Sequence, residues 1–450
     1  MPACTPAFNR ILDDLAKRQL KLDFEFGGER ANYEALRSIG SGAFGIVCEA
    51  KDRHNDRKVA VKKIGHASAT PTLARRTLRE IRVLRYIRHP NIVSLRDVFR
   101  TNGSLGMNVF LIMDLMEWSL HHVIHGSAEP LDFDLIAHLL MQILRGLRYL
   151  HAAGIAHRDL KPSNLLVNSD CHLRIADFGM AKLALKGPID EADEHCFYMT
   201  QHIATLPYRA PELLFVMPEH STAVDLWALG CIFAEMILRR ELFPGRSVGG
   251  QIKLVINQLG TPPTEMIDEI CCDKTKNYLT SFGQLSPRSW EEILISKDHE
   301  PNPAAVDLIS RLTQMTPHDR IDVHKAMTHR FFRPFVQNIP NEPTCPFKVK
   351  MDMAAVESLN HNELVKMLEK DVRSAESSDS HDTKDQHTRL QSGQMGSSSG
   401  ASSNGFTLSD SSGDQMDDKQ QSRRSLSSAF YSEDDEALRK RERSVEITAL

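Results

Sequence analysis

The sequence predicts an α+β fold with a small antiparallel strand-rich lobe, a larger helical lobe and a disordered C-terminal tail. Three observations predict it. Short β-like runs gather before about residue 115, helix-period segments dominate after about residue 130, and 19 of the last 80 residues are serine. A strand-rich lobe followed by a helix-rich lobe favours a cleft between the two. The tail is too polar to offset its ordering entropy by burial.

The small lobe begins where a mixed polar segment, residues 1–30 with one amphipathic stretch at Ile11–Leu22, gives way to β-like runs punctuated by Gly, Asn and Asp. A helix-period segment interrupts these runs once, and helices then follow in the large lobe. The expected strands are Glu34–Ile39, Ile46–Lys51, Lys58–Lys63, Ile92–Phe99 and Val109–Met113, and the expected helices are Thr72–Ile87, Phe133–Ala152, Val224–Arg239, Gly250–Leu259 and Pro303–Gln314.

Composition excludes several classes of protein. No run of about 18 apolar residues is present, so no membrane span is expected, and the N-terminus lacks the pattern of a signal peptide. The eight cysteines form no CxxC pair, which argues against zinc and a disulfide framework. The net charge of −4 divides into −5 for residues 371–450 and +1 for the rest. A nearly neutral body argues against nucleic-acid binding.

A glycine-rich loop opens the small lobe as Gly40-Ser-Gly42-Ala-Phe-Gly45-Ile-Val47. The pattern alone is weak, because glycine turns are common. A dinucleotide-binding fold needs a helix directly after the loop, whereas Ile46–Ala50 is strand-like. We therefore expect a hairpin whose glycines let backbone N–H groups approach phosphates.

Lys62 lies within a β-branched run on the next strand, and Glu80 lies in the helix that follows. Lys62 is either an edge lysine that extends to water or an ammonium that anchors nucleotide phosphates. Glu80 is either a solvated surface residue or the partner that holds Lys62 extended.

The segments His157-Arg-Asp159-Leu-Lys161-Pro-Ser-Asn164 and Asp177-Phe-Gly179 decide between these interpretations. Asp159 is placed to accept the proton of a substrate hydroxyl, and Lys161 to neutralise charge on a moving phosphoryl group. Asn164 and Asp177 offer oxygen ligands of the kind Mg²⁺ prefers. The motifs in this order predict phosphoryl transfer.

Across residues 30–335 the chain resembles the eukaryotic protein kinases, and HRDLKPSN resembles their serine/threonine version. The resemblance implies ATP and Mg²⁺, an adenine site at the hinge Asp114-Leu-Met116 beside Met113, a structural Glu212–Arg320 pair and a structural Asp225. It divides the chain into an extension (1–30), a small lobe (31–114), a large lobe with an insert near 243–300 (115–337), a returning segment (338–370) and a disordered tail (371–450).

The segments MDLMEWSLHHVIH and DFGMAK resemble mitogen-activated protein kinases. The resemblance is strongest to the big, long-tailed extracellular-signal-regulated branch of that family. That family carries Thr-x-Tyr in its activation lip, whereas this chain has Thr200-Gln201-His202, and Leu206 replaces an arginine. The resemblance implies activation by an upstream mitogen-activated protein kinase kinase. Because the tyrosine is absent here, we expect phosphorylation on Thr200 alone. The expected partners of the phosphate are Arg79, Arg158 and Lys182.

The family prefers Ser/Thr-Pro sites in protein substrates, and the segment 203–209 would build the proline pocket. Asn338 and Asn341 stand where the family has aspartates, so docking of basic peptides is expected to be weaker or different. One alternative is a weakly active or non-catalytic scaffold, which the complete set of catalytic residues disfavours. Another is a metabolic transferase, which is disfavoured because such an enzyme is not expected to carry an activation segment that ends in Ala210-Pro-Glu212.

The tail ends in short motifs. Arg439–Arg443 is either a nuclear-localisation signal or a solvated charge run, and Thr448–Leu450 is either a PDZ-type ligand or an ordinary apolar terminus. We expect a cytoplasmic protein that also enters the nucleus.

Overall fold

The computed structural model describes residues 18–21, 23–26, 32–42, 45–103, 106–127, 129–183, 203–218, 220–296, 300, 302–335, 345, 356 and 358–374. Several predictions lie outside these residues: the lip Thr200–His202, the docking positions Asn338 and Asn341, and the tail motifs Arg439–Arg443 and Thr448–Leu450. Within the described residues, no helix has the length and apolar character needed to cross a membrane.

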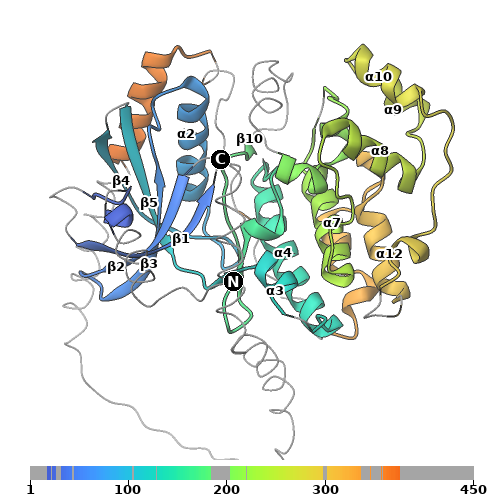
Figure 1. The fold of residues 1–450 in the computed structure, drawn as a ribbon, viewed down its shortest axis with the longest axis horizontal. Coiled ribbons are helices and arrows are strands. Elements are labelled where there is room, and N and C mark those ends of the chain that lie inside the picture. Colours follow the sequence, from blue (N-terminus) through green and yellow to red (C-terminus); the bar gives the residue numbers. More distant parts are fainter. Residues whose placement is uncertain are drawn as a thin grey trace, which may run out of the picture.

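The small lobe is a five-stranded antiparallel sheet in the order β1-β2-β3-β5-β4 (Figure 1). Its strands are β1 (Tyr33–Gly42), β2 (Gly45–Asp52), β3 (Arg57–Ile64), β4 (Leu95–Gly103) and β5 (Gly106–Asp114). Helix α2 (Pro71–Tyr86) is capped by the preceding residue Thr70, whose side chain accepts the N–H of Leu73. Its apolar residues Leu78 and Ile81 share one core with Val109 and Leu111 of β5.

The other face of the sheet is covered by the N-terminal segment. Phe24 and Phe26 are buried there in a second core that includes Phe99 and Phe110. The ring centroids of Phe26 and Phe110 lie 5.6 Å apart in an edge-on arrangement. The sequence indicated only a mixed polar extension here, because two isolated aromatics form no periodic pattern.

The fourth strand begins later than predicted. The expected strand Ile92–Phe99 is wrong at its start, since β4 begins at Leu95. Residues 91–93 instead bond to the large lobe: Val93 N–H donates to the carbonyl of Ile175, and Ile175 N–H donates to the carbonyl of Asn91. Apolar residues before a strand can thus belong to another sheet, which local pattern alone does not show.

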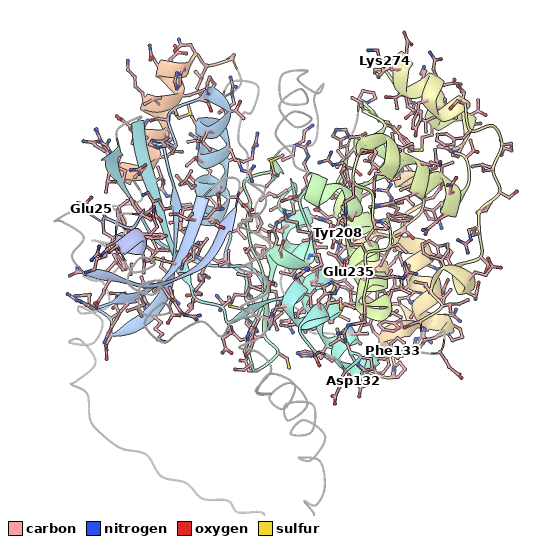
Figure 2. All side chains as sticks on the ribbon, in the orientation of Figure 1. Glu25, Asp132, Phe133, Tyr208, Glu235 and Lys274 are labelled. Atoms are coloured by element: carbon pink, nitrogen blue, oxygen red, sulfur yellow. The ribbon has the colours of Figure 1, made fainter. Side chains whose placement is uncertain are left out.

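The large lobe is built around α4 (Phe133–Ala152) and α7 (Ala223–Leu238), and α4 has the predicted bounds. Asp132 caps α4 by accepting Leu135 N–H at 2.7 Å (Figure 2). The remaining helices are α3 (Leu120–His125), α6 (Pro211–Leu214), α8 (Val248–Leu259), α9 (Thr264–Asp268), α10 (Asp273–Thr280), α11 (Trp290–Ile293), α12 (Pro303–Leu312) and α13 (Val323–Met327). Short strands complete the lobe: β6 (Trp118–Ser119), β7 (Ile155–Ala156), β8 (Leu165–Val167), β9 (Leu173–Ile175) and β10 (Lys182–Leu183).

Residues 361–374 form a further helix, which lies beside α2 (Figure 1, orange). Leu364, Leu368 and Val372 are buried on one face of it, at the i, i+4, i+8 spacing of a helical stripe. Asp371 forms an ion pair with Arg82 of α2. Residues 371–374, which the sequence places in the disordered tail, are therefore part of this helix.

Candidate active site

The glycine-rich loop is a hairpin between β1 and β2, with Gly40 opposite Val47 and Gly42 opposite Gly45. At Gly45 the backbone φ is +154°, and an added Cβ would lie 2.4 Å from the carbonyl oxygen of Lys63. Only glycine fits this close approach. No helix follows the loop, so the dinucleotide-binding alternative is wrong and the hairpin prediction is confirmed.

Lys62 joins the two lobes. It lies on β3 opposite Val47 of β2 and Leu111 of β5. Its Nζ lies 2.6 Å from Glu80 Oε1 on α2 and 3.1 Å from Asp177 Oδ1, which follows β9 in the large lobe. The Lys62 side chain is 12% exposed, so it is not an edge lysine extended to water. Glu80 is buried against it rather than solvated.

Electrostatics favour the ionised forms of this Lys62–Asp177 pair. Burial opposes the charge on Lys62, but Asp177 and Glu80 outweigh it and raise the pKa of Lys62. Burial likewise opposes the charge on Asp177, but Lys62 and Arg76 outweigh it and hold the pKa of Asp177 well below its usual value. Asp177 is therefore a carboxylate at neutral pH, as a metal ligand must be.

Asp159 lies on the loop between β7 and β8 and is buried. Lys161 Nζ lies 3.0 Å from its Oδ2, and the amide nitrogen of Asn164 donates to its backbone carbonyl at 2.8 Å and to Oδ2 at 3.2 Å. The other oxygen, Oδ1, is buried and has no hydrogen-bond partner within the described part of the chain. A buried carboxylate oxygen in this state is suited to receive a hydroxyl proton.

Asp225 of α7 holds this loop from below. Its carboxylate accepts the backbone N–H groups of His157 and Arg158, each at 2.8 Å, and lies 3.0 Å from His151 Nε2. These hydrogen bonds stabilise the left-handed conformation of Arg158, which has a φ of 67°. The expected structural role of Asp225 is confirmed.

Arg76 is a further site residue, which no sequence motif singled out. It lies one helical turn before Glu80 on α2 and is buried, and burial lowers the pKa of its guanidinium although Asp177, Glu80 and Asp159 oppose that shift. A Cβ on Gly179 would lie 2.5 Å from Arg76 Nε, so Arg76 packs directly over that glycine. The i, i+4 spacing from Glu80 was the available signal.

The hinge carries a second ionic link between the lobes. The Asp114 carboxylate pairs with Arg96 of β4 and with Arg174 of β9. Asp114 shares a strand face with Ile112, which lies in the second core, whereas Met113 and Leu111 pack toward the main core. The side chain of Asp114 therefore fixes the hinge from behind, which leaves backbone groups of 114–116 as the adenine readers expected there.

The end of the activation segment is anchored to the large lobe. Tyr208 OH donates to Glu235 Oε2 at 2.7 Å, and His125 Nε2 lies 2.9 Å from Glu235 Oε1 (Figure 2). Leu206, Pro207 and Tyr208 are buried within a short 3₁₀ helix, Ile203–Tyr208. The predicted Glu212–Arg320 pair is confirmed, with both of its hydrogen bonds at 2.6 Å.

The three expected phosphothreonine partners come from separate elements. Arg79 NH1 donates to the carbonyl of Gly179 at 3.4 Å. Lys182 of β10 pairs with Ala156 of β7, two residues before Arg158. Arg79, Arg158 and Lys182 thus border the catalytic loop and its neighbouring Asp177-Phe-Gly179 segment, while Thr200 lies outside the described residues.

The donor set suits a metal held jointly with phosphates. Among the described residues, no group of three or more His, Cys, Asp or Glu side chains forms a metal site of its own. Asn164 and Asp177 offer two oxygen ligands, and the Asn164 nitrogen is committed to Asp159, which leaves its oxygen to face a cation. Mg²⁺ is commonly bound by one or two protein oxygens with phosphates and water completing its shell.

Comparison with known proteins agrees with this geometry. The model of the protein kinase domain matches residues 33–332. The mitogen-activated protein kinase sma-5 of Caenorhabditis elegans is 56% identical over 383 residues, which cover 84% of this chain and 75% of that protein. The mitogen-activated protein kinase sty1 of Schizosaccharomyces pombe is 39% identical over 303 residues, which cover 67% of this chain and 81% of that protein.

Proposed function

This chain belongs to the protein kinase family as a mitogen-activated serine/threonine kinase, and we propose that it phosphorylates Ser/Thr-Pro sites under the control of one phosphate on Thr200. The family in general uses ATP and a divalent metal. The observation that carries the proposal is the position of Lys62, which joins Glu80 of the small lobe to Asp177 of the large lobe. A non-catalytic scaffold is not favoured, because it would not need this buried ionic centre.

Each residue has a separate part in the proposed reaction. Bound ATP–magnesium supplies the phosphoryl group with its charge partly neutralised. Asn164 and Asp177 would hold the metal, the glycine hairpin and Lys62 would hold the phosphates, and Glu80 keeps Lys62 extended. Asp159 orients the acceptor hydroxyl and takes its proton at Oδ1, while Lys161, 3.0 Å from Oδ2, balances negative charge.

Specificity for proline after the phosphorylated residue follows from the segment 203–209. The Tyr208 hydroxyl donates to Glu235, and Arg209 is buried, so both residues fix the position of this part of the substrate surface. Leu206 and Pro207 stand where the family has Arg and Trp. We expect an oriented peptide library to show enrichment of proline at the position after the phosphorylated residue. A library without proline enrichment would overturn this part of the proposal.

Control by Thr200 alone rests on charge. A phosphothreonine carries nearly two negative charges and seeks basic side chains, and Arg79, Arg158 and Lys182 border the catalytic loop. The lip has no tyrosine, and Leu206 occupies the position of an arginine that would pair with phosphotyrosine. The absence of the tyrosine and the absence of the arginine agree with each other, because an arginine beside no phosphotyrosine would have no anion to bind. An upstream mitogen-activated protein kinase kinase would add the phosphate.

Thr200→Ala should lower the activity of the chain co-expressed with such an upstream kinase by roughly 100-fold, because one or two charge-assisted hydrogen bonds contribute about 3 kcal/mol. The measurement is phosphate incorporation into a Ser/Thr-Pro protein in cells. Thr280→Ala, at an exposed threonine of α10, is the matched control and should leave activity unchanged. Full activity of Thr200→Ala would contradict single-site activation.

A further inference from the structure

Ser374 is the last described residue of the helical segment 361–374, and an arginine of α2 binds it. Its hydroxyl oxygen accepts from Arg85 NH1 at 2.8 Å, and its carbonyl oxygen accepts from Arg85 NH2 at 3.1 Å. The hydroxyl itself donates to the carbonyl of Asp371 at 3.0 Å. A neutral serine thus already occupies a position that a fork-shaped cation recognises with two bonds.

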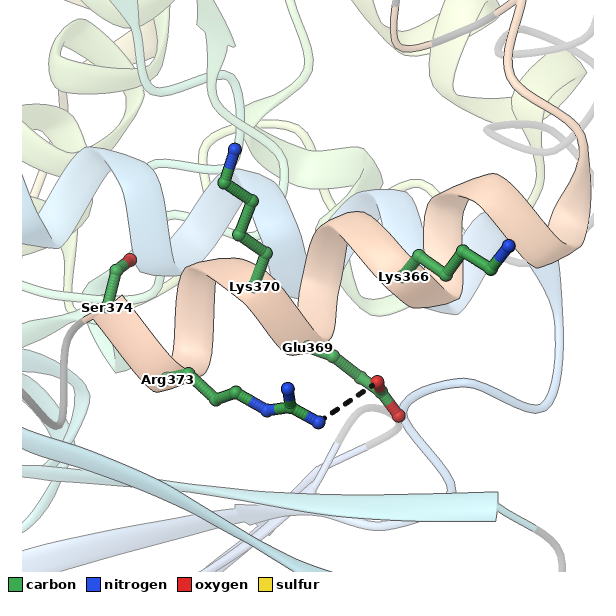
Figure 3. Close-up of a pocket in the computed structure, with 5 residues that line it drawn as sticks. All are labelled: Lys366, Glu369, Lys370, Arg373 and Ser374. Atoms are coloured by element: carbon green, nitrogen blue, oxygen red, sulfur yellow. Dashed lines mark ion pairs between the residues drawn. The ribbon is translucent and has the colours of Figure 1, made fainter.

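Ser374 also opens on a cavity of about 510 Å³ whose other lining residues are Lys366, Glu369, Lys370 and Arg373 (Figure 3). Figure 3 shows Lys370 and Ser374 on the same side of the helix, with Arg373 turned toward Glu369. The single carboxylate among them pairs with Arg373 at 3.6 Å and with Arg100 of β4 at 3.5 Å. The cavity therefore has cations in excess and room for a tetrahedral anion.

We propose that Ser374 is a regulatory phosphorylation site whose phosphate fixes the helix 361–374 to α2. In the modification, Ser374 Oγ forms a bond to the γ-phosphorus of ATP held by another kinase, the bond to the ADP oxygen breaks, and the hydroxyl proton passes to that kinase's base. The product places about two negative charges and three acceptor oxygens beside Arg85 and Lys370. The negative charge of Asp371 opposes a phosphate at Ser374, but Arg82 already neutralises that charge.

The contact leads directly to the active site. Arg82 and Arg85 face the helix 361–374, and Glu80 on the same α2 binds Lys62 at 2.6 Å. A phosphate that tightens the Arg85 contact holds α2 in the position where Glu80 reaches Lys62. Phosphorylation of Ser374 therefore lowers the KM for ATP by favouring the paired state.

The modifying enzyme is a basic-directed kinase. Arg373 and Lys370 precede Ser374, and Ala375 follows it, so a kinase that requires proline at the next position does not fit. The site is thus independent of the proposed Ser/Thr-Pro specificity and of Thr200. It adds a second input, from a different class of kinase, to the same catalytic centre.

The test uses the full chain in the catalytically inactive Asp159→Asn form, with phosphoserine incorporated at position 374 during translation. Amide hydrogen exchange in residues 361–374 and in α2 should slow by about tenfold relative to the unmodified chain. Arg85→Ala should abolish the slowing, and Arg85→Lys should restore only part of it because lysine lacks the fork. Phosphoserine at Ser310, which bonds Asp307 O at 2.8 Å in the same local pattern, is the matched control and should leave exchange in both helices unchanged.

Exchange that stays unchanged or becomes faster in the phosphorylated chain would overturn the proposal. So would slowing that survives Arg85→Ala, or the absence of phosphate on Ser374 in mass spectra of the chain isolated from eukaryotic cells. The exchange measurement needs no catalytic activity. It therefore fails or succeeds separately from the proposed function, and the fall in the KM for ATP is then measured in the active chain.

Discussion

Replacing Asp159 with asparagine should lower kcat by about 10²–10⁴-fold and leave the affinity for ATP near that of the unmodified chain. Asparagine keeps the size of the side chain and can still accept from Lys161 and Asn164, which now contact Asp159 Oδ2 at 3.0 and 3.2 Å. It cannot accept a proton at the position of Oδ1. Steady-state kinetics with a protein substrate, together with a titration of ATP binding, separate the two effects.

Asp273→Asn is the matched control for this change, because Asp273 is exposed in the first turn of α10, away from the site. It should leave kcat unaltered. A fall in kcat of less than tenfold in Asp159→Asn would show that Asp159 is not the base, and an equal loss of ATP binding would show that it holds the nucleotide site instead.

Replacing Arg320 with alanine should reduce the free energy of unfolding by about 3–5 kcal/mol, because it leaves Glu212 as an uncompensated buried charge. Both side chains are fully buried. Arg320 also donates to the carbonyls of Gln314, Ala223 and Met315, and its guanidinium lies 5.2 Å from the ring centroid of Trp227. Urea unfolding followed by circular dichroism measures the change.

Two further variants make this prediction specific. The exposed pair Arg288–Glu292 has a distance of 3.9 Å, and Arg288→Ala should change stability by less than about 0.5 kcal/mol. The double variant Arg320→Met with Glu212→Leu should be more stable than Arg320→Ala, since no buried charge remains. A loss below about 1 kcal/mol in Arg320→Ala would contradict a structural role for the pair.

The strongest periodic signals predicted the fold well. Helix α4 has its predicted bounds because the apolar stripe and the Asp132 cap act together. The hairpin of the glycine loop followed from the strand-like residues after Gly45, which excluded a helix. The Lys62–Glu80 pair is also present, since a buried lysine on a strand and a glutamate on the next helix have few other ways to compensate their charges.

Features that depend on distant partners were not predictable. The local pattern predicts that Ile92 and Val93 belong to the following strand. The backbone around them is instead hydrogen-bonded to Ile175 of the large lobe, far along the chain. Phe24 and Phe26 cover aromatic residues on one face of the sheet, and no local pattern reveals this contact. Asp371 and Ser374 are bound by arginines of α2 that lie 289 residues earlier in the chain, so the polar local sequence alone indicated disorder.

We propose that this chain transfers phosphate itself and is activated by phosphorylation of Thr200. The direct measurement is transfer of labelled γ-phosphate from ATP to a Ser/Thr-Pro protein by the purified full chain carrying phosphothreonine only at position 200. We expect label on the substrate's Ser/Thr-Pro sites at a rate roughly 100-fold above that of the unphosphorylated chain. Transfer no faster than that of Asp159→Asn, or equal transfer with and without the phosphate, would contradict it.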